Sequence, residues 1–155
     1  ARFNSGDLLD ITGGGDHAAS PFPALLTGLG NPTGLFRLSD GQILLANFGG
    51  RIDVIDPPNI TEFASRAGTS FLTIAQLPDG RIFANAHQAE VFEISGGGDL
   101  SGAAPWATGQ EFAGLTVSYA GRLLAGLPGF VPATPLGVQT LLFSFFASIL
   151  GLRRR

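Results

Sequence analysis

Few residues of this chain have the chemistry of a catalytic group. The sequence contains two histidines, His17 and His87, and no cysteine. It therefore lacks a thiolate nucleophile and any cysteine-based zinc or iron–sulfur site. The histidines are far apart in sequence, and only Glu90 lies near His87. The sequence also has no nucleophile elbow, phosphate-binding loop or dinucleotide-binding glycine motif. These residues predict no catalytic residue, no cofactor and a protein that is not an enzyme.

Asparagine and aspartate are the remaining residue types that could bind a metal ion. Asn47 and Asn85 follow the aspartates of two Asp-Gly turns and take equivalent positions in two similar segments. Their amide oxygens could bind a hard cation, but asparagine at a strand end more often closes a turn. We therefore predict no metal site, with Asn47 and Asn85 as weak candidates. The aspartates that could add ligands are Asp7, Asp10, Asp16, Asp40, Asp53, Asp56, Asp79 and Asp99.

Strands, not helices, are expected to position these side chains over residues 1–126. Apolar runs in this part are short, are separated by Gly, Pro, Asp and Asn, and keep no helical period. Asp-Gly between apolar runs predicts a β-hairpin, with the positive φ angles of a type I′ turn. Three similar segments, 35–48, 72–87 and 115–125, contain the turns Asp40-Gly41, Asp79-Gly80 and Ala120-Gly121, and further strands are expected at 51–56 and 90–95.

The similar segments form a repeat. Their turn glycines recur about every 40 residues, and a unit of that length with about four short strands is typical of a β-propeller blade. About three such units fit into residues 1–126, whereas closed propellers have roughly four to eight. The predicted fold is therefore mainly β, with about three repeats arranged as an incomplete β-propeller or as curved antiparallel sheets.

One repeat carries a resemblance to known families. Residues 34–59, GLFRLSDGQILLANFGGRIDVIDPPN, resemble a repeat of NHL-type or gluconolactonase/SMP-30-like propellers, which have a Gly-hydrophobic start, an Asp-Gly turn and a strand ending in Asp-Pro. The resemblance covers roughly residues 5–126 and implies a propeller fold. In SMP-30-like enzymes, a Glu, two Asn and an Asp bind one divalent cation near the central axis, so the resemblance also implies a lactonase- or lyase-like enzyme as an alternative function.

The C-terminal part has the composition of a membrane anchor. Residues 136–152 contain no charged residue and would span about 25 Å as a helix. Three arginines, Arg153, Arg154 and Arg155, follow this run, as the positive-inside rule expects on the cytoplasmic side. We predict a domain at 1–126 that is periplasmic or extracellular, a Pro-rich linker at 127–135, a single-pass transmembrane helix at 136–152 and a cytoplasmic C-terminus. A buried core helix is the alternative interpretation.

Two further features fit an exported, anchored chain. Small residues recur along one side of the expected helix, where another helix could pack closely, although chance would also place such residues there; they are Thr140, Ser144, Ser148 and Gly151. The chain begins Ala1-Arg2-Phe3 without Met, as expected after removal of a signal peptide. Residues 131–155 also resemble PEP-CTERM-type sorting signals, but 131–135 lacks the Glu of that motif.

Charge and architecture together lead to the functional prediction. A net charge of −3 argues against a nucleic-acid partner. We expect a membrane-anchored structural or interaction module whose partners are the lipid bilayer and other protein subunits. It would be an accessory subunit of a larger membrane assembly, for example a respiratory or photosynthetic one, or would assemble with itself. The alternatives are a ligand-binding surface module and the propeller enzyme named above. Asn59-Ile60-Thr61 also matches the N-glycosylation triplet.

Overall fold

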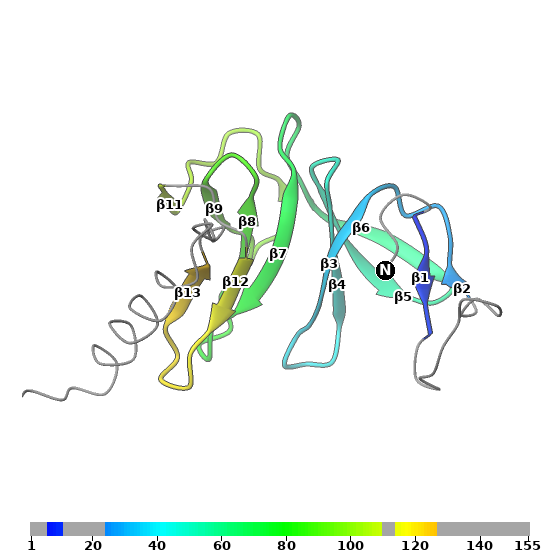
Figure 1. Cartoon of the computed structure of the whole chain (residues 1–155), viewed down its shortest axis with the longest axis horizontal. Coiled ribbons are helices and arrows are strands. Elements are labelled where there is room, and N and C mark those ends of the chain that lie inside the picture. Colours follow the sequence, from blue (N-terminus) through cyan, green and yellow to red (C-terminus); the bar gives the residue numbers. More distant parts are fainter. Residues whose placement is uncertain (1–5, 11–23, 110–113, 127–155) are drawn as a thin grey trace, which may run out of the picture.

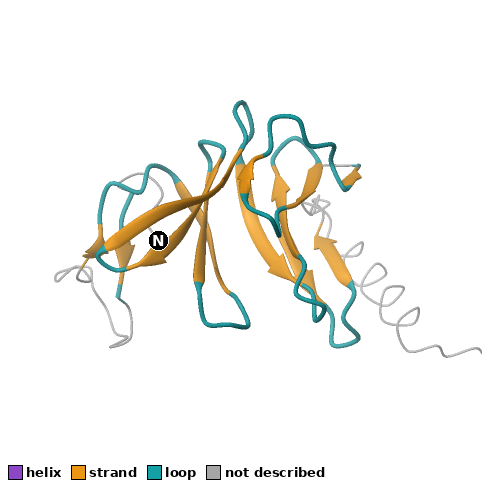
Figure 2. Cartoon of the chain, turned by 180° about the vertical axis from the view of Figure 1, so that it is seen from behind, coloured by secondary structure: helices purple, strands orange, loops and turns teal. Residues whose placement is uncertain are grey.

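The computed structural model describes residues 6–10, 24–109 and 114–126, and this part of the chain consists of strands and loops (Figure 2). The first large sheet has the order β10-β6-β5-β4-β3. Neighbouring strands of this sheet run antiparallel, except that β10 joins β6 in parallel. Its strands are β3 (Pro32–Arg37), β4 (Ile43–Asn47), β5 (Arg51–Asp56), β6 (Asn59–Ser65) and β10 (Gly98–Asp99).

The second large sheet has the order β11-β9-β8-β7 and is antiparallel throughout. Its strands are β7 (Phe71–Gln76), β8 (Ile82–Ala86), β9 (Glu90–Glu93) and β11 (Ala107–Thr108). Two strand pairs flank the large sheets. They are formed by β1 (Leu8–Leu9) with β2 (Ala24–Leu26), and by β12 (Gly114–Val117) with β13 (Leu123–Gly126).

The repeated turns form the predicted hairpins, but their turn type differs from the expected one. In each hairpin the residue after the first strand and the residue before the second enclose a three-residue loop. In the first hairpin, Leu38 N donates to Gln42 O, and Gly41 N donates to Leu38 O. Only the loop glycine has positive φ, at 95° for Gly41 and 91° for Gly80. Such a loop is a type I turn followed by a bulge. Asp40 stabilises its loop by accepting a hydrogen bond from Gln42 N at 2.9 Å.

The two large sheets pack face to face around one apolar core. Alternate residues of their strands meet there, including Leu44 and Ile52 of the first sheet and Phe71 and Phe92 of the second. The rings of Phe71 and Phe92 meet edge to face, with centroids 6.3 Å apart. A smaller cluster, around Leu45, lies on the other side of the first sheet and includes Leu8 and Leu26 of the β1–β2 pair.

This arrangement is propeller-like. Figure 1 shows the sheets side by side, with the first strand of each repeat next to that of its neighbour. These first strands are β3, β7 and β12, and β7 contacts both of the others. A set of twisted antiparallel sheets whose first strands face one another is the architecture of propeller blades. The mainly-β, repeat-based prediction is therefore confirmed at this level.

The predicted anchor lies outside the described residues. This applies to the transmembrane helix at 136–152, to its packing residues Thr140, Ser144, Ser148 and Gly151, and to Arg153, Arg154 and Arg155. Within the described ranges, no helix is long and apolar enough to cross a membrane. The anchor and the orientation derived from it stay predictions.

Candidate functional site

The first strands of the repeats are held together by side-chain hydrogen bonds. Thr33 Oγ1 of β3 lies 2.8 Å from the carbonyl oxygen of Phe71 in β7. One blade further on, Thr73 Oγ1 of β7 accepts a hydrogen bond from Leu115 N of β12 at 2.8 Å. Threonine suits both positions because its β-branched side chain favours a strand and its short hydroxyl reaches the neighbouring backbone.

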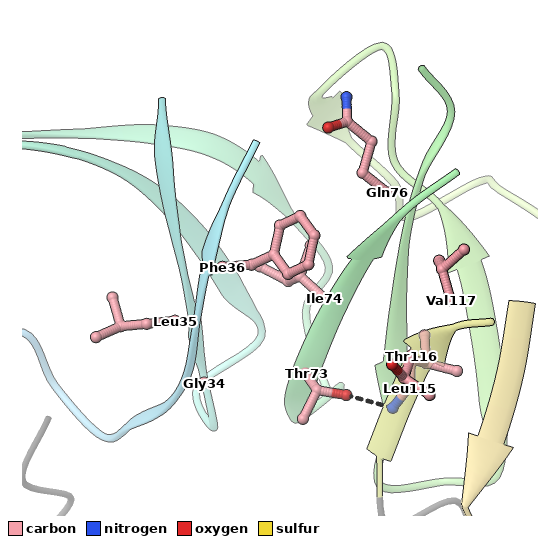
Figure 3. Close-up of a pocket in the computed structure, with 9 residues that line it drawn as sticks. All are labelled: Gly34, Leu35, Phe36, Thr73, Ile74, Gln76, Leu115, Thr116 and Val117. Carbon is pink, nitrogen blue, oxygen red and sulfur yellow. Dashed lines mark hydrogen bonds between the residues drawn. The ribbon is translucent and has the colours of Figure 1, made fainter. Parts of the chain in front are cut away.

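A groove of about 430 Å³ opens between these three strands, and we call it the inner groove (Figure 3). Its volume lies within the range of about 300–1,000 Å³ that is usual for small-molecule sites. Phe36 and Ile74 approach one another from β3 and β7, and Val117 lies on β12 across from them. The lining residues are Gly34, Leu35, Phe36, Thr73, Ile74, Gln76, Leu115, Thr116 and Val117.

The lining of the inner groove is apolar with a few neutral polar groups. Leucine, isoleucine, valine and phenylalanine supply the walls, whereas Thr73, Thr116 and Gln76 supply the polar side chains. Gln76 is held in place, because its Oε1 accepts a hydrogen bond from Ser39 N at 2.8 Å. None of the nine lining residues is ionisable. The groove therefore suits an uncharged organic molecule better than an ion.

The structure separates the two asparagines that the sequence singled out. Within the hairpins, Asn47 pairs with Pro32, whereas Asn85 pairs with Thr73, and Ala46 pairs with Gly34. Asn85 therefore corresponds in register to Ala46 and not to Asn47. A shift of one residue turns a side chain to the opposite face of a strand. The prediction that Asn47 and Asn85 take equivalent positions is therefore wrong.

Each asparagine has its own set of neighbours. Asn47 Nδ2 donates to Asp53 Oδ2 at 2.7 Å in the first sheet. Asn85 Oδ1 accepts hydrogen bonds from both the amide and the hydroxyl of Thr73, at 2.9 and 2.6 Å. In the described part of the chain, no group of three or more His, Cys, Asp or Glu residues could hold a metal ion. The weak candidacy of these asparagines as metal ligands stays an untested prediction.

Sequence reasoning missed a buried charged cluster around Asp53. Its carboxylate is fully buried, and Arg51 Nε lies 2.8 Å from its Oδ1. Burial raises the pKa of Asp53, although the neighbouring Arg51 charge and its hydrogen bond act in the opposite direction. The spacing Arg51, Asp53 places both side chains on one face of β5, and this i, i+2 pair of opposite charges was the available sequence signal.

Other predicted groups have local roles. Asp79 accepts hydrogen bonds from the backbone and side chain of Arg81, which lower the pKa of Asp79. Asp99 does the same with Ser101, and its pKa is lowered too. His87 is exposed and meets the Phe48 ring edge to face, with centroids 5.9 Å apart. His17 and Asp16 lie outside the described residues.

Comparison with known proteins adds a likeness of fold. No family model and no curated protein matches the sequence. One similar solved structure is a candidate gluconolactonase: it shares 17% identity over 68% of this chain and 38% of its own, with a TM-score of 0.49. Another is a catalytically inactive virginiamycin B lyase from Staphylococcus aureus with quinupristin: it shares 17% identity over 70% of this chain and 44% of its own, with a TM-score of 0.40. The chain thus spans less than half the length of either protein.

These structures correct one prediction. The expectation that the chain is not an enzyme is contradicted, because both similar structures carry the names of enzymes. That expectation rested on missing local motifs. A propeller can assemble a site from single residues of separate blades, so the absence of a compact motif is a poor guide in this architecture.

Proposed function

We propose that the inner groove binds a small uncharged organic molecule, as the ligand or substrate site of a propeller protein. The observation that carries this proposal is the convergence of β3, β7 and β12 on one groove of about 430 Å³ with no ionisable residue in its lining. Apolar walls would supply most of the binding free energy, and the few polar groups would orient the ligand.

Thr116 is the polar group best placed to contact such a ligand. Its side chain is exposed and lines the groove, whereas Thr73 and Gln76 are engaged in the hydrogen bonds described above. A hydroxyl can donate to a ligand carbonyl or accept from a ligand hydroxyl. Lactones carry both an ester carbonyl and a compact ring, and the name of one compared protein refers to a lactone substrate. A lactone is therefore the first probe.

The test is binding and turnover of glucono-δ-lactone by the full chain. We expect saturable binding in ligand-observed NMR, and Thr116→Val should weaken it about 5- to 10-fold through loss of one hydrogen bond. Phe36→Ala should weaken it further, because it removes an apolar wall. Acid release from the lactone, compared with the uncatalysed rate, reports turnover in the same samples.

Thr108→Val is the matched control, because Thr108 is an exposed threonine on β11 and does not line the groove. It should bind the probe as the native chain does. Equal affinities for the native chain, Thr116→Val and Phe36→Ala would place the binding site elsewhere and would contradict the proposal.

The anchored accessory role predicted from the sequence is a separate proposal. It depends on residues 136–152, which lie outside the described part of the chain, and on partner subunits. Extraction of the full chain from its membrane in mild detergent, followed by native mass spectrometry, would test it. We expect a larger particle that contains this 16.0 kDa chain, and a lone monomer would contradict the role.

A further inference from the structure

The triplet Asn59-Ile60-Thr61 opens strand β6, directly after the Pro57–Pro58 turn. Asn59 and Thr61 are exposed, whereas Ile60 between them is partly buried against the apolar cluster around Leu45. Successive side chains of a strand point to opposite faces. The inward position of Ile60 therefore directs both Asn59 and Thr61 toward solvent, on the same face of β6.

The space around this triplet is open. Strand β10 pairs only with Ala64 and Ser65 of β6, so in the described part of the molecule no strand covers the outer edge of β6 at Asn59 and Thr61. A groove of about 640 Å³ runs beside the triplet, and Asp56, Asn59 and Thr61 are among its lining residues. An attached sugar would thus meet solvent and an open groove, and no packed side chain would have to move.

A second triplet of similar composition begins just before β3 of the same sheet and serves as an internal contrast. Asn31-Pro32-Thr33 has proline in the middle position, which excludes it as an acceptor. Its threonine hydroxyl is also engaged, because Thr33 Oγ1 lies 2.9 Å from Ala46 O and 2.8 Å from Phe71 O. The enzyme that recognises such triplets reads the hydroxyl at the third position, and Thr61 presents it at the surface.

We propose that Asn59 of the folded chain is an acceptor for an N-linked glycan. The donor would be an oligosaccharide linked to a polyprenyl diphosphate. In the transfer, Asn59 Nδ2 forms a bond to C1 of the first sugar, and the bond from C1 to the diphosphate oxygen breaks. The diphosphate leaves with the electron pair, and one Nδ2 proton passes to a base of the transferase. This site is independent of the inner groove, because Asn59 does not line it.

The experiment uses the folded full chain, a single-subunit oligosaccharyltransferase that reads N-x-S/T, and a lipid-linked oligosaccharide. A fluorescent acceptor peptide in the same tube shows that the transferase is active. We expect a mass increase of one glycan, located at Asn59 by peptide mapping. Asn59→Gln and Thr61→Ala should abolish it, Thr61→Ser should reduce it several-fold, and Asn31 should stay unmodified.

The peptide Ile52–Arg66, released by trypsin at Arg51 and Arg66, serves as the unfolded comparison. Modification of the folded chain at Asn59 supports the proposal whether or not the peptide reacts. Modification of the peptide alone would show that the fold shields the triplet, and would overturn the proposal. So would an unmodified chain and an unmodified peptide in a tube where the reference acceptor has reacted.

Discussion

At the scale of single residues, the most unusual group is the buried carboxylate of Asp53. It has a fully buried position on β5 between Arg51, at 2.8 Å, and Asn47, at 2.7 Å. In the described part of the chain, Asn47 Oδ1 is buried without a hydrogen-bond partner. Burial raises the pKa of Asp53 above its ordinary value of 3.8. The two neighbours therefore compensate only part of the cost of burying the charge.

This raised pKa gives a prediction about pH. The unfolded chain releases the Asp53 proton near pH 3.8, and the folded chain releases it at a higher pH. As pH rises through that window, the folded state holds more protons than the unfolded state, so Asp53 contributes less to stability. Asp53→Asn cannot ionise. Its free energy of unfolding should therefore improve relative to the native chain as pH rises from 3.8 toward neutrality, as urea titrations at several pH values would show.

The quantity to follow is the difference in the free energy of unfolding between the native chain and Asp53→Asn. Asp79 and Asp99 have lowered pKa values, so they make both proteins more stable as pH rises, in the opposite direction to Asp53. Asp56→Asn removes an exposed carboxylate from the end of the same strand and is the control. A stability advantage of the native chain that grows with pH would contradict the assignment.

At the scale of elements, the packing of β3 against β7 depends on a glycine. A Cβ added at Gly34 would lie 2.5 Å from the carbonyl oxygen of Leu72 and 3.3 Å from Thr73 Cα. Both are backbone atoms of the neighbouring first strand, so the obstacle cannot be relieved by a change of rotamer. Gly114 takes the matching position, because it and Gly34 each lie seven residues before the glycine of their turn. A Cβ added at Gly114 would meet only side-chain atoms of Thr73, at 3.9 Å.

We therefore expect Gly34→Ala to force β3 and β7 apart and to reduce the free energy of unfolding by about 1–3 kcal/mol. It should also alter probe binding, because Gly34 lines the inner groove. Gly114→Ala, at the matching position of β12, should change stability by less than about 0.5 kcal/mol. Thermal unfolding of both variants checks this. Equal effects would show that the close approach at Gly34 does not limit the packing.

At the scale of the whole molecule, the two large sheets share one apolar core, and the chain passes between them three times, from β6 to β7, from β9 to β10 and from β10 to β11. After β9 the chain returns to the first sheet as β10. Arg66 directly follows β6 and donates to the carbonyl oxygens of Leu100 and Ala103 in the loop after β10, to the latter at 3.0 Å. Its guanidinium also lies 4.6 Å from the centroid of the Phe92 ring in the second sheet.

The two sheets should consequently unfold together. Trp106, the single tryptophan, packs against Phe83 with ring centroids 4.9 Å apart and reports on the second sheet, whereas far-UV circular dichroism reports on all strands. We expect the two signals to give the same midpoint in denaturant. Arg66→Ala should shift both midpoints equally, with a loss of about 1.5–3 kcal/mol, and Arg66→Lys should recover part of it. Separate midpoints would show two independent units.

Much of the described fold could be read from local chemistry. Asp40-Gly41 and Asp79-Gly80 marked two hairpins, since only glycine adopts the positive φ of these loops without strain. The expected strand 51–56 coincides with β5. The expected strand 90–95 ends earlier, at Glu93 in β9. The candidate site was less predictable, because the inner groove is lined by residues of β3, β7 and β12, none of which carries a motif of its own.

The sequence by itself determined the hairpins, the strand-rich composition and the repeat, because these depend on turn chemistry and on alternation within a few residues. Only the tertiary structure decided which face each side chain occupies. A bulge between Pro32 and Gly34, and another between Phe71 and Thr73, fix a register that local pattern does not encode. In the paired strands Asn85 is level with Ala46 and not with Asn47, and Asp53 is buried. The packing of neighbouring first strands then brings residues about 40 and 80 positions apart into one groove.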